Sequence, residues 1–376
     1  MVLLNKMKKV AVFHNFMDNI GGAEMVTLSF VREFDADLYT TNIDKEKIIK
    51  MGFGDILERI FSIGEVSNIS PFRQQLAFFK FRKLNLSNKY DFFIISGDWA
   101  MSGAVNNHPN MWYAHSPLNE LWEYKNYVKK EILNWWKKPL YDIWVYINRK
   151  LSLSYSKHVD TWVCNSENTK KRIEKYYKKN AKVIHPPIDV SDYINKPDKN
   201  YWLSVNRLTI NKRIDMQIKA FSKLSNENLV IVGCYEKGTS QFESYKKYIE
   251  SIKTDNIEIL NWVSREKLIE LYSECKGLIA TARDEDFGMS VIEAMASGKP
   301  IIASNEGGYK ESVINDRTGI LIDSINEQKI IEAINKIESN LYSDSEKYKN
   351  NSIKQAKKFD TKEFVKSINN IIYNKV

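Results

Sequence analysis

The chain has 376 residues, and at roughly 100 to 200 residues per domain this length predicts two domains. Hydrophobic residues make up 43% and charged residues 27% of the chain, which excludes collagen-like and intrinsically disordered proteins. The cysteines are odd in number and far apart, which indicates a reducing cytoplasm without structural disulfides. They are Cys164, Cys234 and Cys275.

The net charge of +9 is concentrated in the first half of the chain. Residues 1–200 hold 30 basic and 22 acidic side chains, whereas residues 201–376 hold 26 and 25. This surplus predicts an anionic partner, which could be nucleic acid, an acidic membrane or a phosphorylated substrate. No apolar run approaches the roughly 18 to 20 residues that span a bilayer, and the start is unlike a signal peptide. We therefore expect a cytoplasmic protein.

Short apolar runs alternate with helical patterns, which is typical of the α/β class. In the first half we expect a helix at 23–34 and strands at 9–14, 92–96, 161–165 and 181–185. In the second half we expect helices at 214–224 and 265–274 and strands at 201–205, 229–233, 257–260, 277–280 and 300–304. The pattern predicts two doubly wound, Rossmann-like domains.

The predicted domains cover residues 1–190 and 200–358, with a polar, proline-containing join at 188–200. A last helix is predicted over 360–376. Asp360 is a favourable N-cap, Glu363 follows three positions later, and apolar residues then recur at helical spacing.

The first candidate site is the run Gly21-Gly22-Ala23-Glu24, which opens a helix after the first strand. Glycines let the backbone approach a ligand, and a helix N-terminus offers free N–H groups to an anion. Without the GxGxxG spacing, the run alone is weak evidence for a nucleotide site, and a tight strand-to-helix turn is the simpler explanation.

The second candidate site is the pair Arg207 and Lys212, just beyond the strand at 201–205. The carboxyl ends of strands in an α/β sheet face the binding crevice, so two cations there could hold a diphosphate. The alternative is a solvated basic loop, and the neighbouring Arg213 shows how common such charge is.

The third candidate site begins at Glu285-Asp286-Phe287-Gly288-Met289-Ser290 and reaches Glu293, with Glu306-Gly307-Gly308 further on. Carboxylates accept paired hydrogen bonds from vicinal hydroxyls of sugars, and the N–H groups at the start of a helix can point to the same ligand. Unpaired core glutamates would be unusual, which favours a binding role.

With these motifs in this order, the chain resembles the retaining GT-B glycosyltransferases of family 4, also called glycosyltransferases group 1. The Glu-x7-Glu signature is Glu285 and Glu293, and the basic pair is Arg207 and Lys212. The resemblance implies two Rossmann-like domains facing across a cleft, with the donor held by the second domain and a last helix crossing back to the first. It also implies that the nucleotide sugar is a substrate and that neither a metal nor another cofactor is needed.

The segment WYAHSPLNELWE around His115 resembles the mannosyltransferase branch of this family, as does VIHPPID at residues 183–189. The resemblance therefore favours transfer of mannose from GDP-mannose. A UDP-sugar donor remains the nearer alternative.

The resemblance also assigns roles to residues. Arg207 and Lys212 would bind the donor diphosphate and stabilise its growing charge. Glu293 would hold the ribose, and Glu285 the donor sugar with the N–H groups of Phe287, Gly288, Met289 and Ser290. Gly21 and Gly22 would close on the phosphates, and His115 would lie beside the anomeric carbon. Attack would come from the front face, so no carboxylate nucleophile is expected.

The last feature is residues 121–150, which hold four tryptophans, four tyrosines and seven basic residues against three acidic ones. Such a mixture is typical of a surface that docks on anionic lipid, although a helix pair packed on its own domain is equally compatible. We expect a protein at the inner face of the membrane, with a lipid-linked glycan or glycolipid acceptor. A basic protein that binds nucleic acid through residues 170–182 is the alternative from another class, and no nucleic-acid motif supports it.

Overall fold

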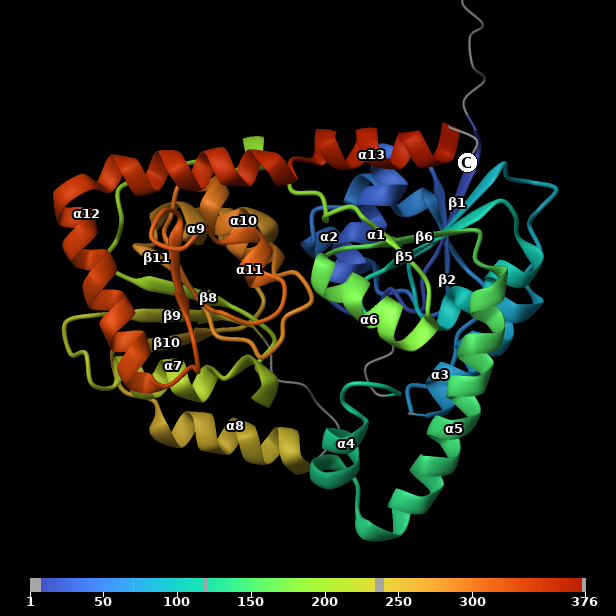
Figure 1. Ribbon diagram of the computed structural model, residues 1–376, viewed down its shortest axis with the longest axis horizontal. Coiled ribbons are helices and arrows are strands. Elements are labelled where there is room, and N and C mark those ends of the chain that lie inside the picture. The colour runs from blue at the N-terminus through green and yellow to red at the C-terminus, as the bar shows by residue number, and fades with distance from the viewer. Residues whose placement is uncertain (1–7, 70, 118–120, 234–239, 374–376) are drawn as a thin grey trace, which may run out of the picture. The chain divides into compact units, whose positions relative to one another are not determined.

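The structure is a computed structural model that describes residues 8–69, 71–117, 121–233 and 240–373. Cys234, residues 118–120 of the segment around His115 and residues 374–376 of the predicted last helix lie outside these ranges. Contacts divide the chain into two units (Figure 1). Unit 1 comprises Met1–His185 with Val365–Val376, and unit 2 comprises Pro186–Phe364.

Unit 1 contains a seven-stranded parallel sheet in the order β3-β2-β1-β4-β5-β6-β7. Its strands are β1 (Val10–Phe13), β2 (Asp37–Thr40), β3 (Ile60–Ser62), β4 (Phe92–Ile95), β5 (Asn110–Ala114), β6 (Thr161–Cys164) and β7 (Lys182–Val183). Its helices include α1 (Gly22–Glu33), α2 (Lys45–Lys50), α3 (Phe72–Lys83), α4 (Lys125–Tyr127), α5 (Lys138–Tyr155) and α6 (Glu167–Tyr177).

Unit 2 contains a six-stranded parallel sheet in the order β10-β9-β8-β11-β12-β13. Its strands are β8 (Trp202–Val205), β9 (Leu229–Val232), β10 (Ile257–Leu260), β11 (Gly277–Ala280), β12 (Ile301–Ser304) and β13 (Gly319–Ile322). Its helices include α7 (Ile214–Phe221), α8 (Ser240–Ile252), α9 (Arg265–Glu274), α10 (Met289–Ala296), α11 (Tyr309–Ser312) and α12 (Glu327–Ala356).

Helices lie on both faces of this second sheet (Figure 1). One apolar cluster, which includes Leu203, packs the sheet against α9, α10 and α11, while another, which includes Trp202, packs it against α7, α8 and α12. Successive residues of a strand point to opposite faces, so a strand buried on both faces is apolar throughout. Unit 2 is therefore a doubly wound α/β sheet, and unit 1 likewise has a parallel sheet with helices between its strands, as the alternating pattern predicts.

Every strand predicted from the sequence is present, within two residues of its expected ends. The strands that the sequence analysis missed are β2, β3, β5 and β13. β2 and β5 begin with the polar residues Asp37 and Asn110, and two of the three residues of β3 are exposed, so none of these three strands is apolar and buried along its whole length. The sheet rather than the local sequence decides their conformation.

The segment 188–200, which we expected to be a polar join, is part of unit 2. Ile188, Val190 and Tyr193 are buried in the same apolar cluster as Leu203. The polar residues between them hid this pattern in the sequence.

The last helix is α13 (Thr361–Tyr373), and its first turn is capped as the sequence predicts. The Asp360 carboxylate accepts a hydrogen bond from the backbone N–H of Lys362 at 3.0 Å. Near its other end, the Lys8 ammonium donates to the carbonyl of Ile372 at 2.6 Å. The end of α13 is thereby tied to the residues that lead into β1.

Candidate functional site

The loops that follow β8 and β11 bring together most of the predicted donor-binding residues. The strand order of unit 2 reverses at β8, which lies between β9 and β11. At such a switch point the connections leave on opposite sides of the sheet, and a crevice opens at the carboxyl ends of the strands. Arg207 follows β8 as an exposed residue, and Glu285 follows β11.

Lys212 and Glu285 form an ion pair at this edge of the sheet. The Lys212 ammonium donates to Glu285 Oε2 at 2.5 Å, and the two side chains are only 14% and 19% exposed. A pair so shielded from water is stronger than one on the open surface. The sequence predicts both residues as ligands of one donor, but it does not predict their contact.

Hydrogen bonds hold these two loops against each other. The Thr281 hydroxyl donates to the carbonyl of Lys212 at 2.8 Å and accepts from the Gln217 amide at 2.8 Å. The backbone N–H of Arg283 donates to the carbonyl of Asn211 at 2.8 Å. The position of Lys212 is thereby fixed through its backbone, while its side chain reaches Glu285.

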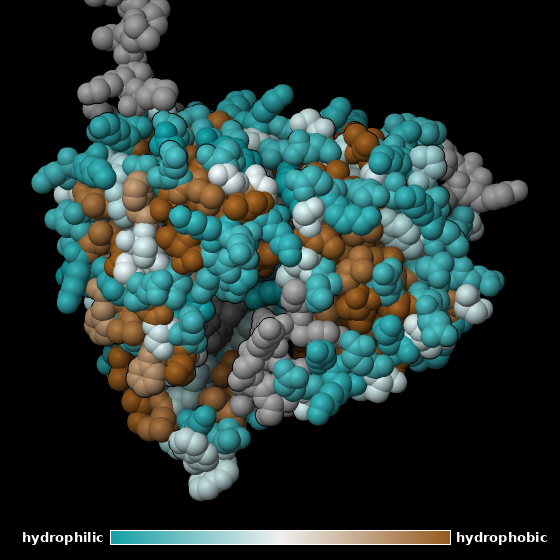
Figure 2. Space-filling view, turned by 180° about the vertical axis from the view of Figure 1, so that it is seen from behind, coloured by the Kyte–Doolittle hydropathy of each residue, from teal (hydrophilic) through white to brown (hydrophobic). Residues whose placement is uncertain are grey.

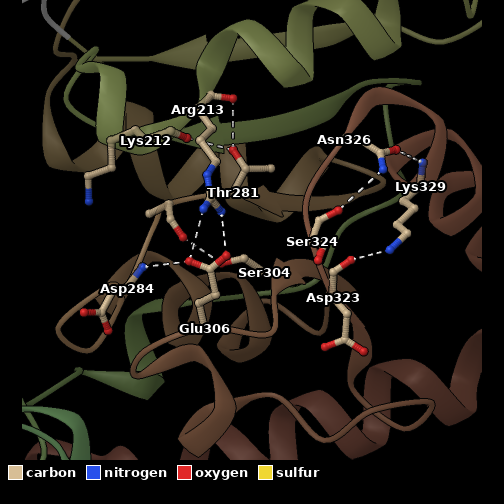
Figure 3. A network of polar contacts seen from close by, with 11 residues as sticks. Lys212, Arg213, Thr281, Asp284, Ser304, Glu306, Asp323, Ser324, Asn326 and Lys329 are labelled. Carbon is tan, nitrogen blue, oxygen red and sulfur yellow. Dashed lines mark hydrogen bonds and ion pairs between the residues drawn. The ribbon is translucent and has the colours of Figure 1, made fainter.

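Arg213, which follows Lys212 in the chain, forms a second ion pair with Glu306 (Figure 3). Two guanidinium nitrogens of Arg213 donate to the two oxygens of Glu306, at 2.9 and 3.2 Å. The backbone N–H of Asp284 donates to the same carboxylate at 3.2 Å. Arg213 is therefore not merely a solvated basic side chain, because its ion pair connects the loop after β8 to the loops after β11 and β12. The only sequence signal for Glu306 is its position between a strand and two glycines.

Glycines let the backbone of the Glu285 loop pack closely against its neighbours. Gly288 has φ +90°, and a Cβ there would lie 2.3 Å from the Tyr309 ring. Gly307 has φ +58°, and a Cβ there would lie 2.3 Å from the carbonyl oxygen of Glu285. Both positions exclude a side chain by conformation and by space.

Gly288 is also the N-cap of α10, so Met289 and Ser290 form the first helical turn. The first N–H groups of a helix have no partner within the helix and can bind a ligand. Phe287 does not contribute its side chain to a site, because its ring is buried against Phe359.

Glu293 lies on α10 with only 6% of its surface exposed. Its Oε2 accepts a hydrogen bond from the Tyr272 hydroxyl at 2.6 Å. Burial raises the pKa of the Glu293 carboxyl, against the opposing effects of the Tyr272 hydroxyl and the charge of Arg265. Glu293 is thus both buried and paired, so its burial does not by itself require a ligand. A carboxylate has about four acceptor positions, so further hydrogen bonds to Glu293 remain possible.

Gly21, Gly22 and His115 lie in unit 1. Gly21 is the N-cap of α1 in an extended conformation, and Gly22 is the first residue of that helix, so the predicted turn is present. His115 follows β5, and its Nε2 lies 2.7 Å from the Ser96 hydroxyl at the end of β4. Burial, with a smaller effect of the nearby His14, lowers the pKa of His115 to about 3, so the ring is neutral.

A family model described as "Glycosyl transferases group 1" matches residues 189–359. This part of the chain belongs to the glycosyl transferases group 1 family. The group 1 domain coincides with most of unit 2 and contains Arg207, Lys212, Glu285 and Glu293. The resemblance inferred from the sequence is confirmed.

Two curated mannosyltransferases are similar to part of the chain. The alpha-1,3/1,6-mannosyltransferase ALG2 of Candida glabrata is 30% identical over 227 residues, which cover 48% of this chain and 49% of that protein. The O-antigen chain mannosyltransferase RfbU of Salmonella typhimurium is 32% identical over 171 residues, which cover 44% of this chain and 47% of that protein. The chain thus spans about half the length of the curated relatives it matches.

The fold is similar to that of solved glycosyltransferase structures. The Anabaena protein Alr3699/HepE, crystallised in complex with UDP and glucose, aligns with a TM-score of 0.76 at 17% identity. The alignment covers 98% of this chain and 100% of that one. The chain, with one Rossmann-like sheet in each unit, therefore has the GT-B fold.

Proposed function

We propose that this protein is a retaining glycosyltransferase that moves mannose from GDP-mannose to a lipid-linked glycan or glycolipid acceptor. The observation that carries the proposal is the shielded Lys212–Glu285 pair at the carboxyl edge of the second sheet. It combines a cation for a diphosphate with a carboxylate for sugar hydroxyls in one place.

In this proposal Lys212 and Arg207 bind the donor diphosphate. Breaking the glycosidic bond leaves additional negative charge on the diphosphate, so cations held in place before the reaction stabilise the transition state. The acceptor hydroxyl attacks from the face that the diphosphate leaves, and its proton passes to the departing phosphate oxygen. No step needs a metal ion or a carboxylate nucleophile.

In this proposal Glu285 accepts hydrogen bonds from hydroxyls of the donor sugar, and the N–H groups of Met289 and Ser290 at the start of α10 donate to the same sugar. Glu293 receives the ribose hydroxyls through acceptor positions that Tyr272 leaves open. The role of these residues is mainly to position the donor.

Mannose is favoured because ALG2 and RfbU, which the chain resembles, are named as mannosyltransferases. A UDP-sugar is the second candidate, because the similar Anabaena structure holds UDP and glucose. The two candidates share the diphosphate and differ in the base.

A thermal-shift screen of GDP, UDP and their sugars tests the donor, because a bound ligand stabilises the folded state by mass action. We expect GDP and GDP-mannose to raise the melting temperature of the wild type and to have less effect on Lys212→Ala. Lys219→Ala is a matched control, since Lys219 is an exposed lysine of α7 paired with Asp215. No transfer from any nucleotide sugar to a lipid-linked acceptor would refute the proposal.

We further propose that the protein docks on an anionic membrane through the α3–α5 surface. We define this surface as Trp135 and Trp136 with one apolar stripe on each helix: Phe72, Leu76 and Phe79 of α3, and Leu140, Ile143 and Ile147 of α5. The stripe residues are between 43% and 64% exposed, and Trp135 is 82% exposed. Hydrophobic side chains gather at the lower left of Figure 2, where α5 begins.

The two helices are held side by side, so their stripes form a fixed feature of unit 1. The Gln75 amide of α3 donates to Asn148 of α5 at 2.6 Å, and the rings of Phe78 and Tyr155 lie 4.9 Å apart. The two helices therefore pack on each other and on unit 1, as expected if residues 121–150 form a helix pair packed on its own domain. They nevertheless leave the apolar side chains of the α3–α5 surface exposed to water.

Basic residues accompany these apolar ones, which favours anionic lipid over a neutral partner. The ammonium of Lys137 lies 5.1 Å from the Trp136 ring, and that of Lys150 lies 4.4 Å from the Tyr146 ring. No helix in the described ranges is long and apolar enough to cross a bilayer. We propose association with the inner face of the membrane by these side chains alone.

Co-sedimentation with liposomes tests this docking. We expect binding to vesicles that contain acidic lipid, weaker binding to zwitterionic vesicles, and loss of binding in the triple variant Leu140→Ser, Ile143→Ser, Ile147→Ser. Ile49→Ser is a matched control, because Ile49 is a 55% exposed apolar residue of α2 outside the α3–α5 surface. Equal sedimentation of the triple variant and the wild type would contradict the proposed surface.

A further inference from the structure

A chain of hydrogen bonds connects two histidines of unit 1 through two hydroxyl groups. Thr27 Oγ1 lies 3.1 Å from His14 Nδ1 and 2.7 Å from Ser96 Oγ, and Ser96 Oγ lies 2.7 Å from His115 Nε2. The Thr27 oxygen also lies 2.8 Å from the carbonyl oxygen of Ala23, one turn back in α1. His14, Thr27 and Ser96 are 5% exposed or less, so water does not complete this network for them.

The number of protons determines the direction of each bond. A hydroxyl group donates one proton and accepts at its lone pairs, whereas a carbonyl oxygen only accepts. The bond to Ala23 therefore takes the Thr27 proton, and Thr27 must accept from both His14 Nδ1–H and Ser96. The Ser96 proton is then used, so Ser96 must accept from His115 Nε2–H. With His115 neutral, this is the arrangement in which each of the four contacts is a hydrogen bond.

This direction leaves His115 Nδ1 without a proton. Among the described residues, the ring of His115 has its hydrogen bond at Nε2, and the residue is only partly buried. The backbone of His115 is also fixed, since its carbonyl accepts from the Asn165 amide at 2.7 Å and from the Thr169 hydroxyl at 3.3 Å. The ring therefore presents a lone pair in a defined direction.

We propose that Thr27 and Ser96 are positioning residues that hold His115 as its Nε2–H tautomer, so that Nδ1 accepts a hydrogen bond from a substrate hydroxyl. The identity of that substrate as a sugar rests on the proposed function, whereas the tautomer does not. The opposite tautomer would offer an N–H to the substrate and would repel a hydroxyl proton.

Nuclear magnetic resonance of the ligand-free protein tests the tautomer directly. The chain has only five histidines, so selective ¹⁵N labelling of histidine gives few signals, and His115→Gln identifies the signal of His115. Couplings between ring nitrogens and ring protons show which nitrogen is protonated. We expect the Nε2–H form in the wild type, and the Nδ1–H form there would overturn the proposal.

Removing the Thr27 hydroxyl should reverse the direction of the chain. In Thr27→Val, Ser96 loses its acceptor and can donate to His115 Nε2, which shifts the ring to the Nδ1–H form. Thr27→Ser should restore the wild-type tautomer. Thr40→Val is the matched control, because the Thr40 hydroxyl is buried at the end of β2 and has no hydrogen-bond partner among the described residues. An unchanged tautomer in Thr27→Val would refute the positioning role.

The same variants then separate this inference from the proposed function. If sugar transfer occurs, we expect kcat/KM to fall about tenfold in Thr27→Val, as for one lost hydrogen bond, and to stay unchanged in Thr27→Ser and Thr40→Val. A wild-type level of transfer in Thr27→Val with a changed tautomer would refute the role of Nδ1. Absence of transfer in the wild type would refute the proposed function and leave the tautomer result standing.

Discussion

Lys212 and Glu285, which we assign to opposite ends of one donor, are bonded to each other in the ligand-free structure, at 2.5 Å. A shielded charge without a partner is costly, so each residue stabilises the other while the site is empty. A diphosphate would compete for Lys212 and would release Glu285 toward the sugar hydroxyls. The pair therefore couples binding at one end of the donor to binding at the other.

Replacement of either partner should reduce both stability and activity. We expect Lys212→Ala and Glu285→Ala to lower the free energy of unfolding by about 1–3 kcal/mol, since a partly buried charge loses its hydrogen bond. Transfer should fall roughly 100-fold or more in Lys212→Ala because the leaving group loses a cation. Urea denaturation and initial rates measure the two effects. Equal losses of stability and activity in the control Lys219→Ala would show that the effects are not specific to the site.

The Arg213–Glu306 pair should control the shape of the Glu285 loop. Glu306→Gln keeps the size of the side chain but cannot bind the guanidinium group with two charged oxygens. We expect a loss of about 1–3 kcal/mol in stability and a higher KM for the donor. Glu327→Gln, which affects an exposed pair with Lys223, should leave both quantities nearly unchanged. A normal KM in Glu306→Gln would show that the loop keeps its shape without this pair.

A side chain at Gly288 should destabilise the start of α10. In Gly288→Ala the new Cβ meets the Tyr309 ring at 2.3 Å in a left-handed backbone conformation, and we expect a cost of about 1–3 kcal/mol with weaker donor binding. In Gly54→Ala the nearest atom lies at an ordinary 3.5 Å, so this control should have wild-type stability and binding. Calorimetry with the donor measures both variants, and normal binding by Gly288→Ala would contradict the assigned role of this turn.

Two of the histidines of unit 1, His14 and His115, should make stability depend on pH. Burial lowers the pKa of His14 to about 4, and burial together with His14 lowers that of His115 to about 3. An unfolded histidine binds its proton near pH 6.5. The unfolded chain therefore takes up protons that the folded protein does not, and stability falls as pH decreases from about 6.5 toward 4. Above pH 6.5 or so the contribution is fully present.

Urea melts of the wild type and His14→Gln at pH values between roughly 7 and 5 check this sign. We expect a flatter pH dependence in the variant. Because the pKa of Glu293 is raised, this residue lowers the stability of the folded protein as pH rises above the ordinary pKa of a glutamate. Wild type and variant share this contribution, so it cancels in the difference between their curves. Parallel pH curves would show that His14 does not contribute.

The sequence by itself determined the α/β class, most strands of both sheets, the family and the candidate residues, because these follow from local apolar runs and from motifs of short spacing. It did not determine how those residues pair. Lys212 and Glu285 are 73 positions apart, Arg213 and Glu306 are 93 apart, and Ser96 meets a threonine 69 positions before it. Within each unit, these partners come from different elements of the chain, which only the folded parallel sheet brings together. The same burial that forms the sheets also keeps Glu293 paired and His115 neutral, which no local pattern records.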